Sequence, residues 1–330
     1  MDHQPRKWME VKDLAVEYTV EGDRVHAVNQ VSFSLDRGQT LGLVGETGAG
    51  KTTIAKSILR ILPDPPARIC GGEIYFEGEE LLTLPEKKMR TIRGNKISMI
   101  FQDPMTALNP VYTVGSQIAE VVALHQKVTG REAQMEAVRM LEKVGIDGER
   151  FGEYPHQFSG GMKQRVVIAM ALACGPKLLL ADEPTTALDV TIQAQVLDMM
   201  NQLKEEFGTS MILITHDLGI VAEMCDQVAV VYAGQIVEMG TAEDIFDRTA
   251  HPYTEGLFNS LPRVEGSKKR LTPIGGMPPN PMELPKGCAF SPRCPYAAKK
   301  CAEQCPGLRH LEGGHYSRCI KENVVRREKR

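Results

Sequence analysis

Residues 45–52 read Gly45-Glu46-Thr47-Gly48-Ala49-Gly50-Lys51-Thr52 and directly follow the apolar run 41–44. This G-x-x-x-x-G-K-T pattern lies between an expected strand and an expected helix, which is the context in which it forms a phosphate-binding loop. Backbone N–H groups of such a loop can surround a triphosphate, because glycines leave no bulky side chains in the way. The pattern therefore predicts an α/β nucleotide-binding fold.

The last residues of the motif have side chains suited to a nucleotide and its metal ion. We expect Lys51 to place its ammonium between the β- and γ-phosphates and the Thr52 hydroxyl to bind Mg²⁺. Thr53 is placed to reach the α-phosphate through its hydroxyl or amide. The strand before the loop and the helix after it disfavour the alternative, which is an ordinary glycine turn followed by an exposed lysine.

A second group of polar residues follows two apolar strands. Asp182 ends the run 178–181, where a carboxylate is costly unless it meets a cation, so we expect it to hold Mg²⁺ through water. Glu183 points elsewhere and is expected to orient or deprotonate the attacking water. His216 follows the strand 211–214 and is expected to touch the γ-phosphate, although a lone histidine at such a place is more often structural.

Composition places the chain among soluble globular proteins. It has 330 residues, of which 42% are hydrophobic and 25% charged, enough for a large core and a second unit. The net charge of -3 gives no general attraction to nucleic acid or anionic lipid, so no nucleic-acid partner is expected. The first residues lack a basic region followed by an apolar core, which indicates a cytoplasmic protein with reduced cysteines.

Periodicity predicts the order of the elements. Residues 9–44 alternate apolar and polar positions and are expected to be rich in strands, and a helix is expected from Lys51 through Ile61. Residues 115–145 read as a helical insertion that includes a capping box at 129–132. The strand, helix and strand over 177–214 predict a parallel sheet.

Beyond about residue 250 the chain changes character, because prolines crowd a stretch of poor periodicity. A separate C-terminal module over 251–330 is therefore expected. It contains five of the eight cysteines, namely Cys288, Cys294, Cys301, Cys305 and Cys319.

Between the two phosphate motifs the chain has Ser159-Gly160-Gly161, which resembles the signature of ATP-binding cassette (ABC) ATPases. The resemblance covers about residues 10–250, where Gln102, then Ala187-Leu188-Asp189, and then His216 fall in the family's order. It implies a P-loop NTPase cassette over residues 1–250 with a parallel RecA-like core sheet and an N-terminal antiparallel β subdomain. A helical signature subdomain is implied at about 103–175.

The resemblance also implies roles for single residues. In the family the signature acts across a dimer, so each ATP lies between Lys51 of one subunit and Ser159, Gly160 and Gly161 of its mate. Gln102 is expected to sense Mg²⁺ and pass its occupancy toward a transmembrane partner that docks on residues 103–145, unless that surface is only a solvated helical face. Tyr18 is placed to stack on adenine, with strand packing as the alternative, and Asp189 is counted with the nucleotide-binding residues.

The C-terminal stretch is similar to the module appended to oligopeptide and dipeptide importer ATPases. The similar residues are His251-Pro252-Tyr253-Thr254 with Leu257 and Leu261-Pro262, then Gly287-Cys288-Ala289-Phe290 and Arg293-Cys294-Pro295. Met162 agrees with that branch, whereas most of the wider family has glutamine at its position.

The same resemblance implies a [4Fe-4S] cluster held by Cys288, Cys294, Cys301 and Cys319. Cys305 has no counterpart in the family, which makes the ligand set ambiguous. From spacing alone, zinc bound by three cysteines with His310 or His315, or thiols without a ligand, remain open.

Together with these motifs, the resemblance implies the ATP-hydrolysing subunit of a peptide importer, expected on the cytoplasmic face of a bacterial or archaeal cell membrane. The resemblance implies a second cassette, either identical or a paralogue, two transmembrane permease subunits and an extracytoplasmic solute-binding protein. Nickel or another small solute is the alternative cargo. A soluble ABC ATPase acting on ribosomes or DNA repair and a non-hydrolysing regulatory module are the alternatives of other classes.

Overall fold

The computed structural model describes residues 8–186, 188–260 and 273–321, and it divides into two compact units. The first unit contains the described residues of 1–35, 40–82 and 215–330, and the second contains 36–39 and 83–214. The phosphate loop and the five C-terminal cysteines therefore belong to the first unit. Gln102, Ser159 and Glu183 belong to the second.

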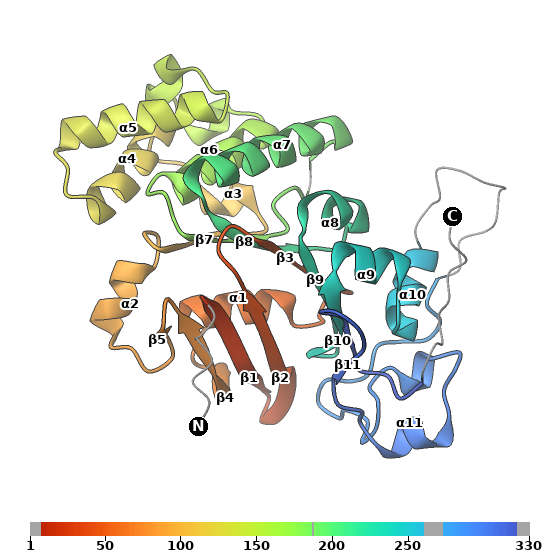
Figure 1. Cartoon of the computed structure of the whole chain (residues 1–330). Helices are drawn as coiled ribbons and strands as arrows, with labels where there is room; N and C mark the ends of the chain where they lie inside the picture. The colour runs from red at the N-terminus through yellow and green to blue at the C-terminus, as the bar shows by residue number, and fades with distance from the viewer. Residues whose placement is uncertain (1–7, 187, 261–272, 322–330) are drawn as a thin grey trace. The chain divides into compact units, whose positions relative to one another are not determined.

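An antiparallel sheet forms the N-terminal part of the first unit (Figure 1). Its order is β2-β1-β4-β5, with β1 at Met9–Val20, β2 at Asp23–Leu35, β4 at Ala67–Phe76 and β5 at Glu79–Glu80. The apolar side chains of Val11, Leu14 and Val16 on β1 are buried. The predicted antiparallel N-terminal subdomain is confirmed.

A second run of strands in the first unit carries the phosphate loop. Its order is β11-β12-β10-β9-β3. The bounds are β3 Thr40–Val44, β9 Gln227–Tyr232, β10 Gln235–Thr241, β11 Arg309–His310 and β12 Tyr316–Ser317. β3 pairs with β9 in parallel and every residue of β3 is buried, as expected of a strand covered on both faces.

Helices of the first unit are short. They are α1 Lys51–Leu59, α8 Leu218–Met224, α9 Ala242–Asp247, α10 Pro252–Asn259, the 3₁₀ turn η3 Ser291–Arg293 and α11 Lys299–Glu303. α1 contacts β2, and α8 contacts β3.

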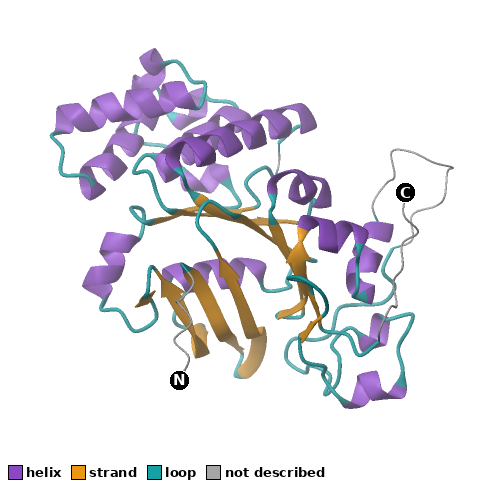
Figure 2. Ribbon diagram, viewed as in Figure 1, coloured by secondary structure: helices purple, strands orange, loops and turns teal. Residues whose placement is uncertain are grey.

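Three parallel strands form the sheet of the second unit, in the order β8-β7-β6. They are β6 Ile97–Ile100, β7 Leu178–Asp182 and β8 Ser210–Thr215, and all their residues are buried. Figure 2 shows that helices make up most of the rest of this unit. These are α2 Glu86–Ile92, α3 Pro104–Ala107, α4 Val114–His125, α5 Gly130–Lys143, η1 Gly148–Gly152, η2 Pro155–Gln157, α6 Gly160–Leu172 and α7 Val190–Phe207.

Helix ends show which local predictions succeed. Thr129 caps α5 in a capping box with Glu132, and Gly208 ends α7 with a left-handed φ of 62°, both as predicted. The prediction that the helix after the phosphate loop continues through Ile61 is wrong. Arg60 already adopts a left-handed φ of 51°, and the amide of Ile61 bonds back to Lys56 O, which closes the helix at Leu59.

The described residues 273–321, which we call the cysteine segment, consist mainly of loop in Figure 2. β12 of this segment pairs with β10, so it extends the run of strands that contains β3. The division into units keeps the segment with the phosphate loop. The boundary at residue 250 stays a prediction, and residues 261–272 and 322–330 of the expected module lie outside the described residues.

Candidate functional site

The phosphate loop joins β3 to α1 with a backbone that requires glycine. Gly45, Gly48 and Gly50 have φ values of 154°, 81° and 102°. A Cβ on Gly45 would lie 2.1 Å from Val231 O, and one on Gly50 would lie 2.4 Å from Ala27 O. Close backbone approach therefore fixes the loop at both ends. α1 begins directly after it, and a helix N-terminus is a place that favours anions.

Lys51 lies across this loop. Its Nζ donates to Gly45 O at 2.8 Å and to Glu46 O at 3.0 Å, and the residue is only 6% exposed. Thr52 and Thr53 follow it in the first turn of α1. The structure thus brings the predicted residues from Gly45 to Thr53 together as one contiguous cradle.

A cavity of about 250 Å³ lies beside the loop in the first unit. It is lined by Val25, His26, Ala27, Glu46, Thr47, Gly48, Ala49, Tyr232, Ala233, Gly234, Pro278, Pro279, Pro281 and Leu284. Tyr18 does not line this cavity, but it pairs with Val25 across β1 and β2. Its stacking on adenine stays a prediction.

The second unit brings Gln102 and Glu183 into contact. Gln102 Nε2 donates to Glu183 Oε2 at 2.8 Å, and Thr186 Oγ1 donates to the same oxygen at 3.0 Å. The Glu183 amide donates to Ile214 O at 2.8 Å, and its backbone has a left-handed φ of 47°. Two donors and a fixed backbone therefore aim this carboxylate, and the sequence had not indicated Thr186.

Asp182 and His216 keep their predicted places at strand ends. Asp182 is the last residue of β7 and is 3% exposed, and His216 directly follows β8 and is exposed. Lys51 and His216 belong to the first unit, whereas Asp182, Glu183 and Gln102 belong to the second. Their assembly around one nucleotide stays a prediction.

Ser159 and Asp189 are exposed at helix starts in the second unit. Ser159 is the N-cap of α6, where its Oγ accepts from the Met162 amide at 3.4 Å. Gly160 and Gly161 form the first turn, and a Cβ on Gly161 would lie 2.7 Å from Ile192 Cγ2. Asp189 has the N-cap position of α7, and the neighbouring Ala187 lies outside the described residues. The predicted signature is thus an open helix N-terminus.

Four of the five C-terminal cysteines line one small cavity of about 20 Å³, which we call the cysteine cavity. They are Cys288, Cys294, Cys301 and Cys319, the set implied by the family resemblance. Burial raises the pKa of Cys288 to about 11 and raises the pKa of Cys294 and Cys319. Cys305 is exposed and does not line it.

Metal binding by these thiols is not shown by their placement. Within the described ranges, no three His, Cys, Asp or Glu side chains are grouped closely enough to hold a metal ion. His310 and His315, the alternative zinc ligands, do not line the cysteine cavity. The structure therefore gives four neighbouring thiols, and the cluster stays a prediction.

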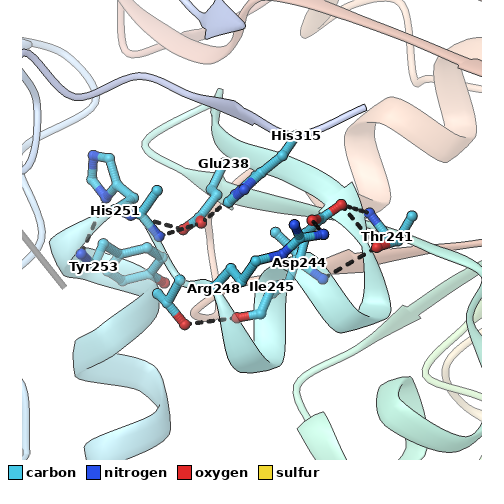
Figure 3. A network of polar contacts seen from close by, with 10 residues as sticks. Glu238, Thr241, Asp244, Ile245, Arg248, His251, Tyr253 and His315 are labelled. Carbon is cyan, nitrogen blue, oxygen red and sulfur yellow. Dashed lines mark hydrogen bonds and ion pairs between the residues drawn. The ribbon is translucent and has the colours of Figure 1, made fainter. Parts of the chain in front are cut away.

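A buried polar network attaches the cysteine segment to β10 (Figure 3). Glu238 is 0% exposed and accepts from the amides of Ala250 and His251 at 2.6 and 2.9 Å. His315 Nε2 lies 2.9 Å from the same carboxylate. Glu238 thus joins β10, the start of α10 and the cysteine segment.

The burial of His251 predicts that the fold becomes less stable at acidic pH. Its Nδ1 accepts from the Tyr253 amide at 3.1 Å, and burial lowers its pKa to about 3. The unfolded chain binds this proton near pH 6.5, so between pH 6.5 and about 3 the unfolded state holds more protons. We expect the free energy of unfolding to fall as the pH drops through this window, by about 3 kcal/mol at pH 4.

Denaturant unfolding at several pH values measures this effect. His251→Asn keeps a capping acceptor and should flatten the dependence, whereas His310→Asn changes an exposed histidine and should leave the slope as it is. Equal slopes in the wild type and His251→Asn would remove His251 as the cause.

No helix in the described part of the chain is both long enough and apolar enough to span a bilayer.

Comparison with known proteins identifies the family and the fold to which this chain is similar. Residues 28–186 match the model of the ABC transporter family, and residues 237–301 match that of the oligopeptide/dipeptide transporter C-terminal region. The oligopeptide transport ATP-binding protein OppD of Bacillus subtilis (strain 168) is 52% identical over 93% of this chain and 87% of its own length. The dipeptide transport ATP-binding protein DppD of the same organism is 50% identical over 95% of this chain and 94% of its own length.

Among solved structures, the dimeric structure of MJ0796, a bacterial ABC transporter cassette, is similar with a TM-score of 0.64 and 25% identity. The similarity covers 71% of this chain and 98% of that one. The predicted cassette fold, with its antiparallel N-terminal sheet, is confirmed.

Proposed function

Because this chain belongs to the family of ABC transporter ATP-binding proteins for oligopeptides and dipeptides, we propose that it is the ATP-hydrolysing subunit of a peptide importer. The observation that carries the proposal is the identity of 52% to an oligopeptide transport ATP-binding protein over 93% of the chain. The phosphate loop geometry supplies the chemical basis, since its glycines and Lys51 form a cradle for a triphosphate.

Each predicted residue would have its own role in hydrolysis. The loop amides and Lys51 bind the β- and γ-phosphates, while Thr52 and Asp182 have the hydroxyl and carboxylate chemistry that suits Mg²⁺. A bound Mg²⁺ would neutralise charge on those phosphates. Glu183 takes the proton of the attacking water, Gln102 and Thr186 orient its carboxylate, and His216 contacts the γ-phosphate.

A second cassette would complete each site. Ser159 caps an exposed helix N-terminus, which attracts negative charge through backbone amides and the helix dipole. ATP would lie between the phosphate loop of one subunit and this helix start of its mate, and its hydrolysis would let the two separate. The similar cassette has a dimeric structure, which supports the pairing of two cassettes.

Exposed apolar side chains on the second unit favour docking of a permease. Met105, Tyr112, Leu124 and Met135 are 60%, 56%, 75% and 55% exposed, and all fall within 103–145. A cytoplasmic helix of a permease subunit would cover them, with the chain peripheral on the cytoplasmic membrane face. A solute-binding protein outside the membrane would deliver the peptide.

Uptake by vesicles tests the proposal. The chain is reconstituted with its genomically neighbouring permease subunits and solute-binding protein, and uptake of labelled dipeptides, longer peptides and Ni²⁺ is measured with and without ATP. We expect ATP-dependent uptake of peptide. Uptake of Ni²⁺ alone would support the small-solute alternative, and ATP hydrolysis that membrane partners leave unchanged would favour a soluble ABC ATPase.

We also propose that Cys288, Cys294, Cys301 and Cys319 hold a [4Fe-4S] cluster. Four thiols that line one cavity have the donor chemistry of such a cluster, which binds cysteine thiolates. The cluster would tie together turns that have little regular structure of their own. Its proposed role is structural or regulatory.

Colour and metal content test the cluster. Protein purified anaerobically should be brown, with broad absorption at the violet edge of the visible range, and Cys288→Ser or Cys319→Ser should bleach it. Cys305→Ser is the matched control and should keep the colour, because Cys305 does not line the cavity. Colourless protein with stoichiometric zinc would contradict the iron–sulfur assignment and support the zinc alternative.

A further inference from the structure

Glu46, the second residue of the phosphate loop, is held by two side chains from the C-terminal part of the first unit. Its amide donates to Tyr253 Oη at 2.9 Å. Its two carboxylate oxygens accept from the two terminal nitrogens of Arg293 at 2.8 and 3.0 Å. This is the paired geometry in which arginine binds a carboxylate most strongly.

Arg293 is itself fixed. Its side chain is 5% exposed, and its Nε donates to Gly275 O at 3.0 Å. The guanidinium also donates to Tyr232 Oη at 3.3 Å. Its hydrogen bonds to Glu46 raise the pKa of Arg293 further above its usual range, so its charge is permanent. A buried charge of this kind is costly to leave without its partner.

The turn that carries Arg293 lies between two thiols of the cysteine cavity. Arg293 ends η3, which runs from Ser291 and is flanked by Cys288 and Cys294. The amide of Ser291 donates to Cys288 O at 2.9 Å, and that of Cys294 donates to Ser291 O at 3.4 Å. Whatever orders these two cysteines therefore orders the turn and the guanidinium.

Aromatic packing holds the same turn against the residues around the loop. Phe290 lies edge-on to the rings of Tyr232 and Tyr253, with centroids 5.3 and 5.4 Å apart. The cysteine cavity, the turn and the phosphate loop thus form one chain of direct contacts within the first unit.

We propose that Arg293 is a positioning residue for the phosphate loop, and that the state of the cysteine cavity sets the affinity for ATP through the Arg293–Glu46 pair. The proposal rests on the proposed function, because it takes the loop to bind ATP. It assigns the cysteine segment a regulatory action on the nucleotide site.

Charge gives the direction of the effect. Glu46 places a carboxylate in the loop that must receive a triphosphate. Its negative charge repels the negative charges of the phosphates. Arg293 neutralises this carboxylate and also holds the loop, so losing Arg293 weakens ATP binding. When Glu46 is neutral, the guanidinium has no carboxylate to neutralise and its loss has little further effect.

A double-mutant cycle tests the pair. Equilibrium binding of a fluorescent ATP analogue is measured for the wild type, Arg293→Met, Glu46→Gln and the double variant. We expect Arg293→Met to weaken binding about tenfold, which corresponds to about 1.4 kcal/mol. In the Glu46→Gln background the same change should weaken it less than about twofold.

Controls separate this role from a structural one. Arg90→Met removes an exposed arginine of α2 that pairs with Glu86, far from the cysteine cavity in sequence and in the other unit, and it should leave ATP affinity within about twofold of the wild type. Equal loss from Arg293→Met in both backgrounds overturns the proposal, because it would show that Arg293 acts without Glu46. A wild type that binds no ATP would instead refute the proposed function.

The cysteine cavity is tested in the same assay. Cys294→Ser changes a thiol beside Arg293 and should weaken ATP binding about fivefold in the wild type but less than about twofold in Glu46→Gln. Cys70→Ser, an exposed cysteine on β4, is the matched control. An unchanged affinity in Cys294→Ser overturns the link to the cavity. The cycle measures ATP binding and needs no iron. A wrong cluster assignment would therefore show in the colour and metal content of the protein and would not change how the cycle is interpreted.

Discussion

Glu183→Gln should lower ATP turnover by about 10²–10⁴-fold while ATP binding is retained, because loss of a general base typically has this effect. The glutamine side chain has nearly the same shape and keeps an oxygen that can accept from Gln102 and Thr186, as Oε2 of Glu183 does. The variant therefore removes proton uptake while it preserves the local hydrogen bonds. Steady-state phosphate release and equilibrium nucleotide binding measure the two quantities.

The matched control is Glu205→Gln, which changes an exposed glutamate near the end of α7 and should leave turnover unchanged. If ATP holds two subunits together, Glu183→Gln should also accumulate an ATP-dependent dimer, which size-exclusion chromatography detects. Unchanged turnover would show that Glu183 is not the general base. Loss of ATP binding together with turnover would assign Glu183 to the structure of the site.

Local signals explain why much of the cassette could be predicted from the sequence. The capping box at Thr129 and the glycine that ends α7 depend on neighbours within a few residues. A short stretch of sequence is therefore enough to predict their geometry. The buried strands β3, β7 and β8 appear as short apolar runs for the same reason. The error at Ile61 arose because Arg60, a residue with ordinary helix propensity, takes the left-handed position.

Pairings between distant residues could not be predicted in this way. Gln102 and Glu183 were both identified as candidates, but their hydrogen bond joins positions 81 residues apart. Arg293 and Glu46 are separated by 247 residues, and each has an alternative interpretation by itself, as a surface arginine and as a variable loop position. The pairing of β12 with β10 and the packing of Phe290 on Tyr232 are among the contacts that hold Arg293 near Glu46.

Gly45→Ala should abolish measurable ATP binding, with a loss of affinity of at least about 100-fold, or about 2.7 kcal/mol. The added Cβ would lie 2.1 Å from Val231 O, and a backbone atom of β9 cannot move aside as the end of a flexible side chain can. The loop must therefore shift, and the two carbonyls that hold Lys51, Gly45 O and Glu46 O, shift with it. A misplaced ammonium cannot bridge the phosphates.

Gly48→Ala separates this clash from the general strain of left-handed backbone. Gly48 also has a positive φ, 81°, but no described atom lies within 4 Å of the position its Cβ would take. Its cost is therefore limited to backbone strain of about 1–2 kcal/mol, so ATP binding should weaken by roughly 5–30-fold and remain measurable. Nucleotide titration and thermal unfolding of both variants provide the comparison. If the two variants lose equal affinity, glycine matters here for its backbone freedom alone, and contact with β9 does not set the shape of the phosphate loop.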